Sequence, residues 1–175
     1  MNRAVFLDRD GVLTRALVRD GKAFAPLKLA EAEIPAEVAP ALARLKSAAF
    51  LLVVITNQPD VARGLAAQKD VEAIHAALRK VLPLDGIFVC YHDDADGCAC
   101  RKPQPGMLFE AARKHAIDLA HSFMIGDRWR DVDAGAAAGC RTILIECGYS
   151  ERPPENTPDA RVTSLREAVD WILRN

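Results

Sequence analysis

Apolar residues along the chain alternate between short continuous runs and longer stretches with helical spacing. Five runs are rich in β-branched or aromatic residues and predict buried strands, at 4–8, 50–56, 86–92, 122–127 and 140–147. Between and after them, apolar residues recur every three or four positions and predict amphipathic helices at 35–48, 66–82, 105–117, 130–139 and 163–175. This alternation predicts an α/β fold: a mainly parallel five-stranded Rossmann-like sheet with helices on both faces.

Residues with reactive or charged side chains gather where the predicted strands end. Asp8 and Asp10 follow the first strand, and Thr56 ends the second. A loop with three cysteines and Lys102 follows the third strand, and Asp127 ends the fourth. Because such sheets bind ligands beyond the carboxyl ends of their strands, these residues are expected to share one site.

Length and composition set limits on what the site can bind. The chain has 175 residues, half of them hydrophobic, and we expect one domain spanning 1–175. The formal net charge is −1, so no overall positive field would attract nucleic acid or an anionic membrane. A small anionic substrate remains compatible, because it needs only a local group of donors.

The cysteines and the first residues bear on the compartment. The apolar run near the start, "AVFL", is too short for a signal peptide, and no stretch is long enough to span a membrane. Three of the five cysteines lie in one loop with a histidine, which favours metal binding over disulfides. We therefore expect a cytoplasmic protein, with Cys140 and Cys147 as ordinary core residues.

The stretch "FLDRDGV" places two carboxylates one residue apart at a strand end. In extended backbone, Asp8 and Asp10 project to the same side, where their charges repel unless a cation lies between them. Mg²⁺ suits such oxygen ligands. A solvated turn after a strand would use the same residues, so the motif alone leaves both interpretations open.

Three further signals are each ambiguous alone. Thr56 and Asn57 could donate hydrogen bonds to a phosphate oxygen, or could serve a cap or turn. Lys102 is either a cation for the site or a surface lysine in a loop. Asp127 and Asp131 are either metal ligands or favourable negative charge at a helix start.

Together, "FLDRDG", "TNQ", "CRKPQPGM" and "GDRWRDVDAG" occur in order on successive strands. Over its whole length the sequence resembles the haloacid dehalogenase-like (HAD) phosphatases. The resemblance implies phosphoryl transfer through a covalent aspartyl phosphate. Asp8 would be the nucleophile, and Asp10 would act as general acid and then general base. Thr56 and Lys102 would hold the phosphoryl oxygens, with Asn57 as a neighbouring contact.

The resemblance also implies a Mg²⁺ site. The ion would be bound by Asp8, the backbone carbonyl of Asp10, and Asp127. Asp131 would orient its water ligands or Lys102. Such a set is consistent with phosphoryl transfer, which depends mostly on positioning and on cations near the developing charge.

The loop before Lys102 contains a metal-ligand pattern of its own. Cys90, His92, Cys98 and Cys100 offer three thiolates and an imidazole, a set suited to a closed tetrahedral Zn²⁺ site. A site with no open position is structural, and it would fix Arg101 and Lys102 just beyond it. Free cysteines in a reducing compartment are the alternative.

No insertion is large enough for a cap domain, and the "CxH…CxCRKP" loop resembles one capless subgroup. That subgroup contains D-glycero-D-manno-heptose 1,7-bisphosphate 7-phosphatases and histidinol-phosphate phosphatases. It implies a small phosphorylated sugar substrate, with the heptose bisphosphate as the first expectation and histidinol phosphate as the alternative. Gln58, Arg63 and Arg101 become candidate substrate contacts, Arg101 for a second phosphate; for the arginines, solvent-exposed loop charge is the alternative.

The substrate-facing loops depart from this subgroup in two places. Pro59 and Asp60 stand where Ser-Gly is usual, and "GVLTRALVRDGKAFAP" lacks the usual Thr and Asn after the first motif. Two competing functions are a nucleic-acid end phosphatase, which the charge argues against, and a zinc-stabilised binding module without activity. The presence of every catalytic residue argues against the second. We expect the protein to be a monomer.

Overall fold

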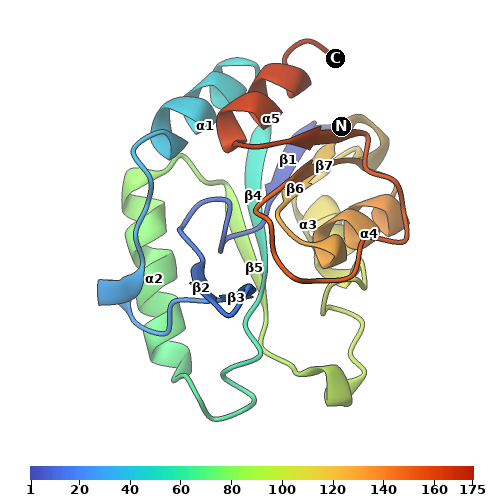
Figure 1. Cartoon of the computed structure of the whole chain (residues 1–175). Helices are drawn as coiled ribbons and strands as arrows, with labels where there is room; N and C mark the ends of the chain where they lie inside the picture. The colour runs from blue at the N-terminus through green and yellow to red at the C-terminus, as the bar shows by residue number, and fades with distance from the viewer.

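The computed structural model describes all 175 residues and is built around a six-stranded parallel sheet (Figure 1). From one edge to the other, the strands are β5 (Gly86–Cys90), β4 (Leu51–Asn57), β1 (Ala4–Leu7), β6 (Phe123–Gly126), β7 (Arg141–Ile145) and β8 (Ala160–Val162). The predicted α/β class and mainly parallel sheet are confirmed.

Helices cover both faces of this sheet, as the sequence pattern predicts. One face carries α1 (Val38–Ser47), α2 (Gln68–Val81) and α5 (Leu165–Ile172), and the other carries α3 (Gly106–His115) and α4 (Trp129–Ala138). Three short 3₁₀ segments lie in the connections: η1 (Leu29–Glu31), η2 (Asp94–Asp96) and η3 (Leu119–His121). No helix has the length and apolar character needed to cross a membrane.

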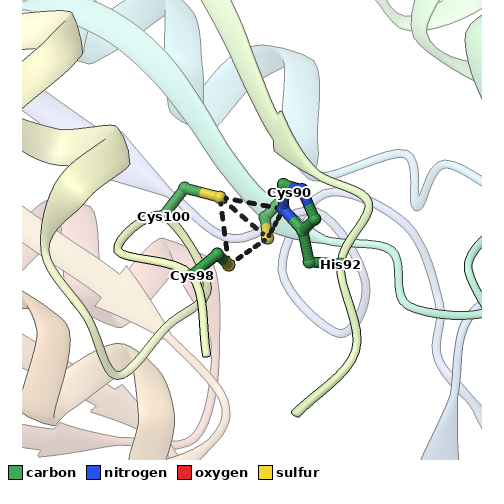
Figure 2. A group of neighbouring side chains, drawn as sticks. All are labelled: Cys90, His92, Cys98 and Cys100. Carbon is green, nitrogen blue, oxygen red and sulfur yellow. Dashed lines mark hydrogen bonds between the residues drawn. The ribbon is translucent and has the colours of Figure 1, made fainter. Parts of the chain in front are cut away.

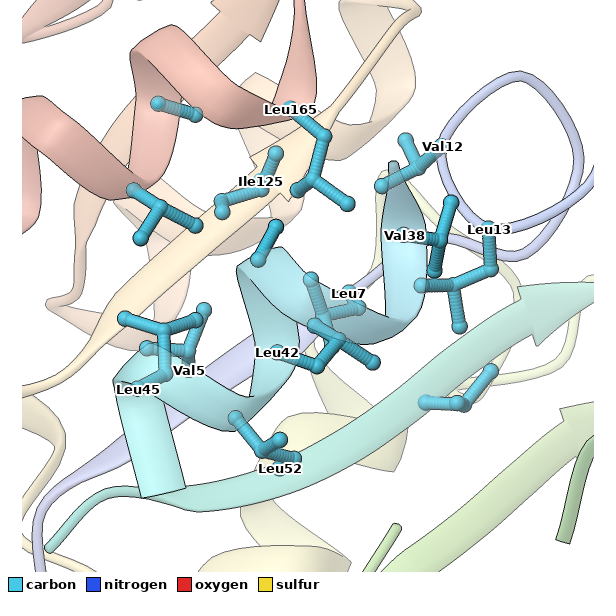
Figure 3. Close-up of a cluster of buried hydrophobic side chains, with 14 of the residues drawn as sticks. Val5, Leu7, Val12, Leu13, Val38, Leu42, Leu45, Leu52, Ile125 and Leu165 are labelled. Atoms are coloured by element: carbon cyan, nitrogen blue, oxygen red, sulfur yellow. The ribbon is translucent and has the colours of Figure 1, made fainter. Parts of the chain in front are cut away.

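The core divides into two clusters because successive strand residues point to opposite faces. On β1, Val5 and Leu7 pack towards α1 and Leu42 (Figure 3), whereas Ala4 and Phe6 pack towards α3 and α4. The whole of β1 is therefore buried, which explains its continuous apolar run. Truncating Leu42 to Ala would remove about 2–5 kcal/mol of stability by leaving a cavity.

The sheet has one strand more than the five that the sequence predicted. The additional strand, β8, pairs in parallel with β7, and Ile143 lies opposite Ala160. It spans three residues at the sheet edge, where Ala160 and Val162 pack against the core and Arg161 is exposed, and this alternation is too short to predict a strand.

A two-stranded hairpin in the 12–49 region was also missed. It joins β2 (Leu17–Arg19) to β3 (Lys22–Phe24) through Asp20 and Gly21, which both have positive φ. Positive φ at both central residues is typical of a type I′ turn, for which Asp-Gly is a favoured sequence. The signal was therefore present, but the flanking runs are short and largely exposed.

The strand order places a topological switch beside β1. Along the chain, the sheet grows from β1 to β4 and β5 on one side, and then through β6, β7 and β8 on the other. The chain therefore leaves the carboxyl end of β1 towards one side of the sheet and the carboxyl end of β6 towards the other. The charged residues that follow these two strands face the crevice between them.

Candidate active site

Three buried carboxylates meet at the carboxyl ends of β1 and β6. Asp8 directly follows β1, Asp127 directly follows β6, and Asp131 lies in the first turn of α4. One oxygen atom from each of the three lies within 4.8 Å of the others. The sequence separation of Asp8 from the other two is large, so only the pairing of β1 with β6 brings them together.

Two glycines permit this close approach. A side chain at Gly126 would place its Cβ 2.0 Å from the Cβ of Asp131, so only glycine lets α4 start this near β6. Gly11 has φ +90°, and a Cβ there would lie 1.8 Å from Oδ2 of Asp127. The glycine in "DRDG" thus both turns the backbone and leaves space for the third carboxylate.

Lys102 is the cation among these carboxylates. Its Nζ donates to Oδ1 of Asp8 at 2.8 Å, to Oδ1 of Asp131 at 2.5 Å and to the carbonyl of Ile55 at 2.8 Å. Burial lowers the pKa of Lys102, but the charges of Asp131 and Asp8 raise it by more, so the net direction is upward. The side chain is therefore an ammonium ion with all three donors engaged.

One lysine does not balance three carboxylates. Burial raises the pKa of Asp8 to about 6, with Asp131 and Asp10 adding to the rise and Lys102 opposing it. Burial, followed by the charges of Asp8 and Asp131, also raises the pKa of Asp127 well above its ordinary value. The site therefore has an excess of negative charge in a buried position.

The residues fit a hard divalent cation. Both carboxylate oxygens of Asp127 are buried and have no hydrogen-bond partner, although a buried carboxylate is normally satisfied. Oxygen donors in a group of three carboxylates match the preference of Mg²⁺. Asp131 is the third member of this group, and its Oδ1 also accepts a hydrogen bond from Nζ of Lys102.

Asp10 lies beside this group and accepts four hydrogen bonds. Arg9 donates from Nε and Nη2 to its two oxygens at 2.9 and 3.0 Å. Thr14 donates to Oδ1 at 2.9 Å, and Gln58 donates to Oδ2 at 2.8 Å. The four donors fix the plane of the carboxylate at the edge of the pocket.

Gln58 does not reach the pocket where the sequence had placed it. Its side chain is 3% exposed, and its amide donates to Asp10 and, at 3.0 Å, to Oγ1 of Thr56. It therefore lies beneath the site and links two predicted catalytic residues. The sequence could not show this, because the side chain folds back from the end of β4.

The side chain of Asn57 forms two hydrogen bonds with the backbone of Lys102. Its Nδ2 donates to the carbonyl of Lys102 at 3.0 Å, and its Oδ1 accepts from the amide of Lys102 at 3.1 Å. The two bonds hold the backbone of Lys102 against the end of β4. Asn57, the last residue of β4, therefore fixes the lysine from the end of its strand, and it also lines the pocket.

A pocket of about 650 Å³ opens over these residues. Asp8, Asp10 and Lys102 form part of its floor. Its walls come from the β2–β3 hairpin, from the loop after β4 and from the start of α4, and they include Arg19, Lys22, Phe24, Asp60, Arg63, Arg101 and Arg130. The hairpin residues were not predicted, because the hairpin itself was missed.

The two arginines proposed as substrate contacts do line this pocket, but each is already paired. Arg63 donates to Asp93 from Nε at 2.8 Å and from Nη2 at 2.5 Å. Arg101 donates from Nε to Asp94 at 2.8 Å and is largely buried. Their charges are therefore partly neutralised by two acidic residues of the cysteine-rich loop.

The cysteine-rich loop brings four potential metal ligands together (Figure 2). Sγ of Cys100 lies 3.1 Å from that of Cys90 and 3.3 Å from that of Cys98, and Nδ1 of His92 lies 3.3 Å from Cys100. All three cysteines are free thiols. Four soft donors around one point match the ligand set of a tetrahedral Zn²⁺ site.

This loop is connected to the active site by Asp94. Besides Arg101, Asp94 accepts from Nη1 of Arg130 at 3.1 Å, and the same Nη1 donates to the carbonyl of Lys102 at 3.2 Å. The position of the loop therefore affects the position of the Lys102 backbone through Arg130. Of the remaining cysteines, Cys140 is buried as predicted, but Cys147 is exposed because it lies two residues beyond β7.

Known proteins resemble this chain in both sequence and fold. A family model described as HAD-hydrolase-like matches residues 99–168. A D-glycero-beta-D-manno-heptose-1,7-bisphosphate 7-phosphatase from Bordetella bronchiseptica is 39% identical over 86% of this chain and 84% of that protein. One from Helicobacter pylori is 35% identical over 98% of this chain and 97% of that protein. The chain belongs to the HAD-like phosphatases.

Solved structures agree with this membership. The crystal structure of the D,D-heptose 1,7-bisphosphate phosphatase from B. bronchiseptica, complexed with magnesium and phosphate, has a TM-score of 0.82 and 34% identity. It covers 98% of each chain. A HAD-like phosphatase structure from Mesorhizobium loti has a TM-score of 0.73 at 29% identity. The resemblance to a capless HAD phosphatase is thus confirmed, and this phosphatase has no separate cap domain.

Proposed function

We propose that this protein is a Mg²⁺-dependent phosphatase that removes the 7-phosphate of D-glycero-D-manno-heptose 1,7-bisphosphate. The observation that carries the proposal is similarity at 34–39% identity over 86–98% of this chain to phosphatases of that name. It is combined with buried Asp8, Lys102, Asp127 and Asp131, which meet at the carboxyl ends of β1 and β6. A pocket of about 650 Å³ is of the size that holds a small phosphorylated sugar.

In the first step, a carboxylate oxygen of Asp8 attacks phosphorus and forms an aspartyl phosphate while the phosphorus–oxygen ester bond breaks. Asp10 supplies a proton to the departing sugar oxygen. To carry that proton, an Asp10 oxygen must release one of its four donors, and Thr14 and Gln58 are the uncharged ones.

In the second step, Asp10 takes a proton from water, which attacks the same phosphorus. The bond to Asp8 breaks, inorganic phosphate leaves, and the Asp8 carboxylate is regenerated. The ammonium of Lys102 would exchange one of its carboxylate partners for a phosphoryl oxygen, and the hydroxyl of Thr56 would donate to another. Asn57 keeps the backbone of Lys102 in position. Fixed donors of this kind stabilise charge in the transition state without reorganisation.

The residues that would hold Mg²⁺ are Asp8, the backbone carbonyl of Asp10, Asp127 and Asp131. When bound, the ion supplies a positive charge against the phosphoryl oxygens and balances the excess of carboxylates. Cys90, His92, Cys98 and Cys100 would hold a structural Zn²⁺ that orders the loop before Lys102. The protein's partner is then a small phosphorylated sugar.

The test is phosphate release with Mg²⁺ from both anomers of heptose 1,7-bisphosphate, histidinol phosphate, fructose 1,6-bisphosphate and a nucleoside monophosphate. We expect a preference of orders of magnitude for one heptose anomer. A preference for histidinol phosphate would move the protein to the alternative function of its subgroup. Equal and slow turnover of every compound would contradict the proposed substrate.

The nucleophile is tested by Asp8→Asn, which should abolish turnover while the protein stays folded. Asp70→Asn is the matched control, because Asp70 lies at the start of α2 and does not line the pocket. Its turnover should equal that of the wild type. Normal hydrolysis by Asp8→Asn would rule out the covalent mechanism. A wild type that releases no phosphate from any compound would instead favour the binding module.

A further inference from the structure

Arg9, the residue between the two motif aspartates, is completely buried. Its Nε and Nη2 face the two oxygens of Asp10, and its remaining terminal nitrogen, Nη1, lies 3.1 Å from Nε2 of His75. An arginine is rarely buried unless each part of its guanidinium has a partner. His75 comes from α2, far along the chain from the motif, so only the fold joins the three residues.

The chemistry of the guanidinium fixes the form of His75. A guanidinium carries only donors, so Nε2 of His75 must accept and cannot carry a proton. The neutral ring then has its proton on Nδ1. Burial, and next the charge of Arg9, lower the pKa of His75 to about 4, in agreement with a neutral ring at neutral pH.

Other residues support the ring from the opposite side. Nδ1 of His75 lies 3.7 Å from Oε2 of Glu72, and Oε1 of Glu72 accepts a hydrogen bond from the hydroxyl of Tyr91. His75 itself is 3% exposed. The ring therefore lies between Glu72 and Arg9. Nδ1 has no partner within hydrogen-bond distance, so the hydrogen bond of the ring is the contact of Nε2 with Nη1 of Arg9.

We propose that His75 is a positioning residue for catalysis: its neutral Nε2 holds Arg9, and Arg9 in turn fixes the carboxylate of Asp10 for proton transfer. The inference rests on the proposed function, because it assumes that Asp10 acts as acid and base. Without the acceptor, Nη1 becomes a buried donor with no partner, and the guanidinium must shift to find one. Asp10 then loses the alignment that two of its four donors impose.

The decisive measurement is rapid-mixing kinetics of His75→Leu with p-nitrophenyl phosphate and Mg²⁺. Formation of the aspartyl phosphate expels p-nitrophenolate, a leaving group that needs no proton, so this step is insensitive to Asp10. Hydrolysis of the intermediate still needs Asp10 to take a proton from water. We expect the first step to keep its wild-type rate while the steady-state rate falls on the order of 10-fold or more, so that p-nitrophenolate is released in a burst.

Two variants separate positioning from a general loss of structure. His75→Gln keeps an acceptor oxygen for Arg9 and should restore most of the steady-state rate. Leu78→Ala removes core packing one turn along α2, and it should lower thermal stability while both kinetic phases stay as in the wild type. If His75→Leu lowers both phases equally, or leaves the steady state unchanged, or if His75→Gln fails to recover it, the proposal is wrong.

A second measurement does not depend on activity. The ¹⁵N resonances of the His75 ring in the wild-type protein report which nitrogen carries the proton. A protonated Nδ1 with an unprotonated Nε2 is required by the proposal, and a protonated Nε2 would overturn it. If the wild type instead failed to hydrolyse any phosphate ester, the proposed function would fail, while this tautomer measurement would still decide the Arg9–His75 contact.

Discussion

At the scale of single residues, Asp127 shows how the site opposes folding. Its two oxygens are buried without a partner, and burial raises its pKa. The folded chain therefore keeps the proton to higher pH than the unfolded chain, so the free energy of unfolding falls as pH rises above the ordinary carboxyl value of 3.8. The destabilisation should be present at neutral pH and absent under acidic conditions.

Asp127→Asn should therefore stabilise the metal-free protein at pH 7.5 by roughly 1–3 kcal/mol. The difference should shrink as pH falls towards 4, and with saturating Mg²⁺ the wild type should become the more stable protein. Urea denaturation at several pH values, with EDTA or with Mg²⁺, measures the free energy of unfolding of both proteins under each condition. A lower metal-free stability of Asp127→Asn at pH 7.5 would contradict this account.

Asp118→Asn provides the opposite control. Asp118 lies near the surface, and a hydrogen bond with His121 lowers its pKa. A lowered pKa gives stability that is present at neutral pH and lost as pH falls. This variant should therefore be slightly less stable than the wild type at pH 7.5, with no dependence on Mg²⁺.

At the scale of elements, the cysteine-rich loop should depend on zinc. A metal that binds only the folded chain stabilises it by about 2.7 kcal/mol when its free concentration is a hundredfold above Kd. Cys98→Ser should lose the metal, and because Asp94 in this loop holds Arg101 and Arg130, turnover should fall as well. Metal analysis and thermal unfolding measure both effects.

The matched control for that loop is Cys147→Ser, which changes an exposed cysteine outside the cluster. It should retain one zinc ion per chain, together with the stability and turnover of the wild type. Freshly prepared wild-type protein without zinc, or a Cys98→Ser variant with full stability, would contradict a structural zinc site.

The β2–β3 hairpin is the second element that can be tested, because its effect on substrate binding can be separated from its effect on stability. Gly21 has φ +73°, and an added Cβ would lie 2.6 Å from Oγ of Ser150. Gly21→Ala should distort the pocket wall and raise KM for the bisphosphate severalfold, because the added Cβ would press against Ser150, which lines the pocket. p-Nitrophenyl phosphate is too small to need the pocket wall. Its turnover should therefore stay within about twofold of the wild type, a difference of well under 1.4 kcal/mol.

Gly148→Ala is the control for backbone strain. Its φ of +71° is nearly the same, but nothing lies within 4 Å of an added Cβ. It should lose similar stability without a selective rise in KM. Equal KM values in the two variants would mean that the hairpin does not contact the substrate.

At the scale of the whole molecule, we predict a monomer. Among the large apolar side chains that remain exposed, Phe24 and Leu65 line the active-site pocket, so their exposure does not require an interface between subunits. Light scattering after size-exclusion chromatography should give the mass of one chain. A stable dimer would contradict this prediction.

Much of the molecule follows from local sequence. The apolar run of β1 and the helical spacing of α1 predict their burial, because a parallel strand must be covered on both faces. Asp8, Asp10 and Lys102 were identified at strand ends, and the ligand spacing of the cysteine-rich loop was visible as well. These features depend on periodicity or on neighbouring residues, which a sequence displays directly.

The remainder was decided by contacts between distant segments. Pairing of β1 with β6 sets Asp127 beside Asp8, and folding of α2 over the first motif sets His75 against Arg9. The sequence could not assign Gln58 to the support of Asp10, because that contact depends on a side-chain direction. Local pattern therefore determined the helices and strands and the residue types at their ends. The tertiary structure alone decided which of these residues share a site, because side chains become buried and meet their partners only when the sheet assembles.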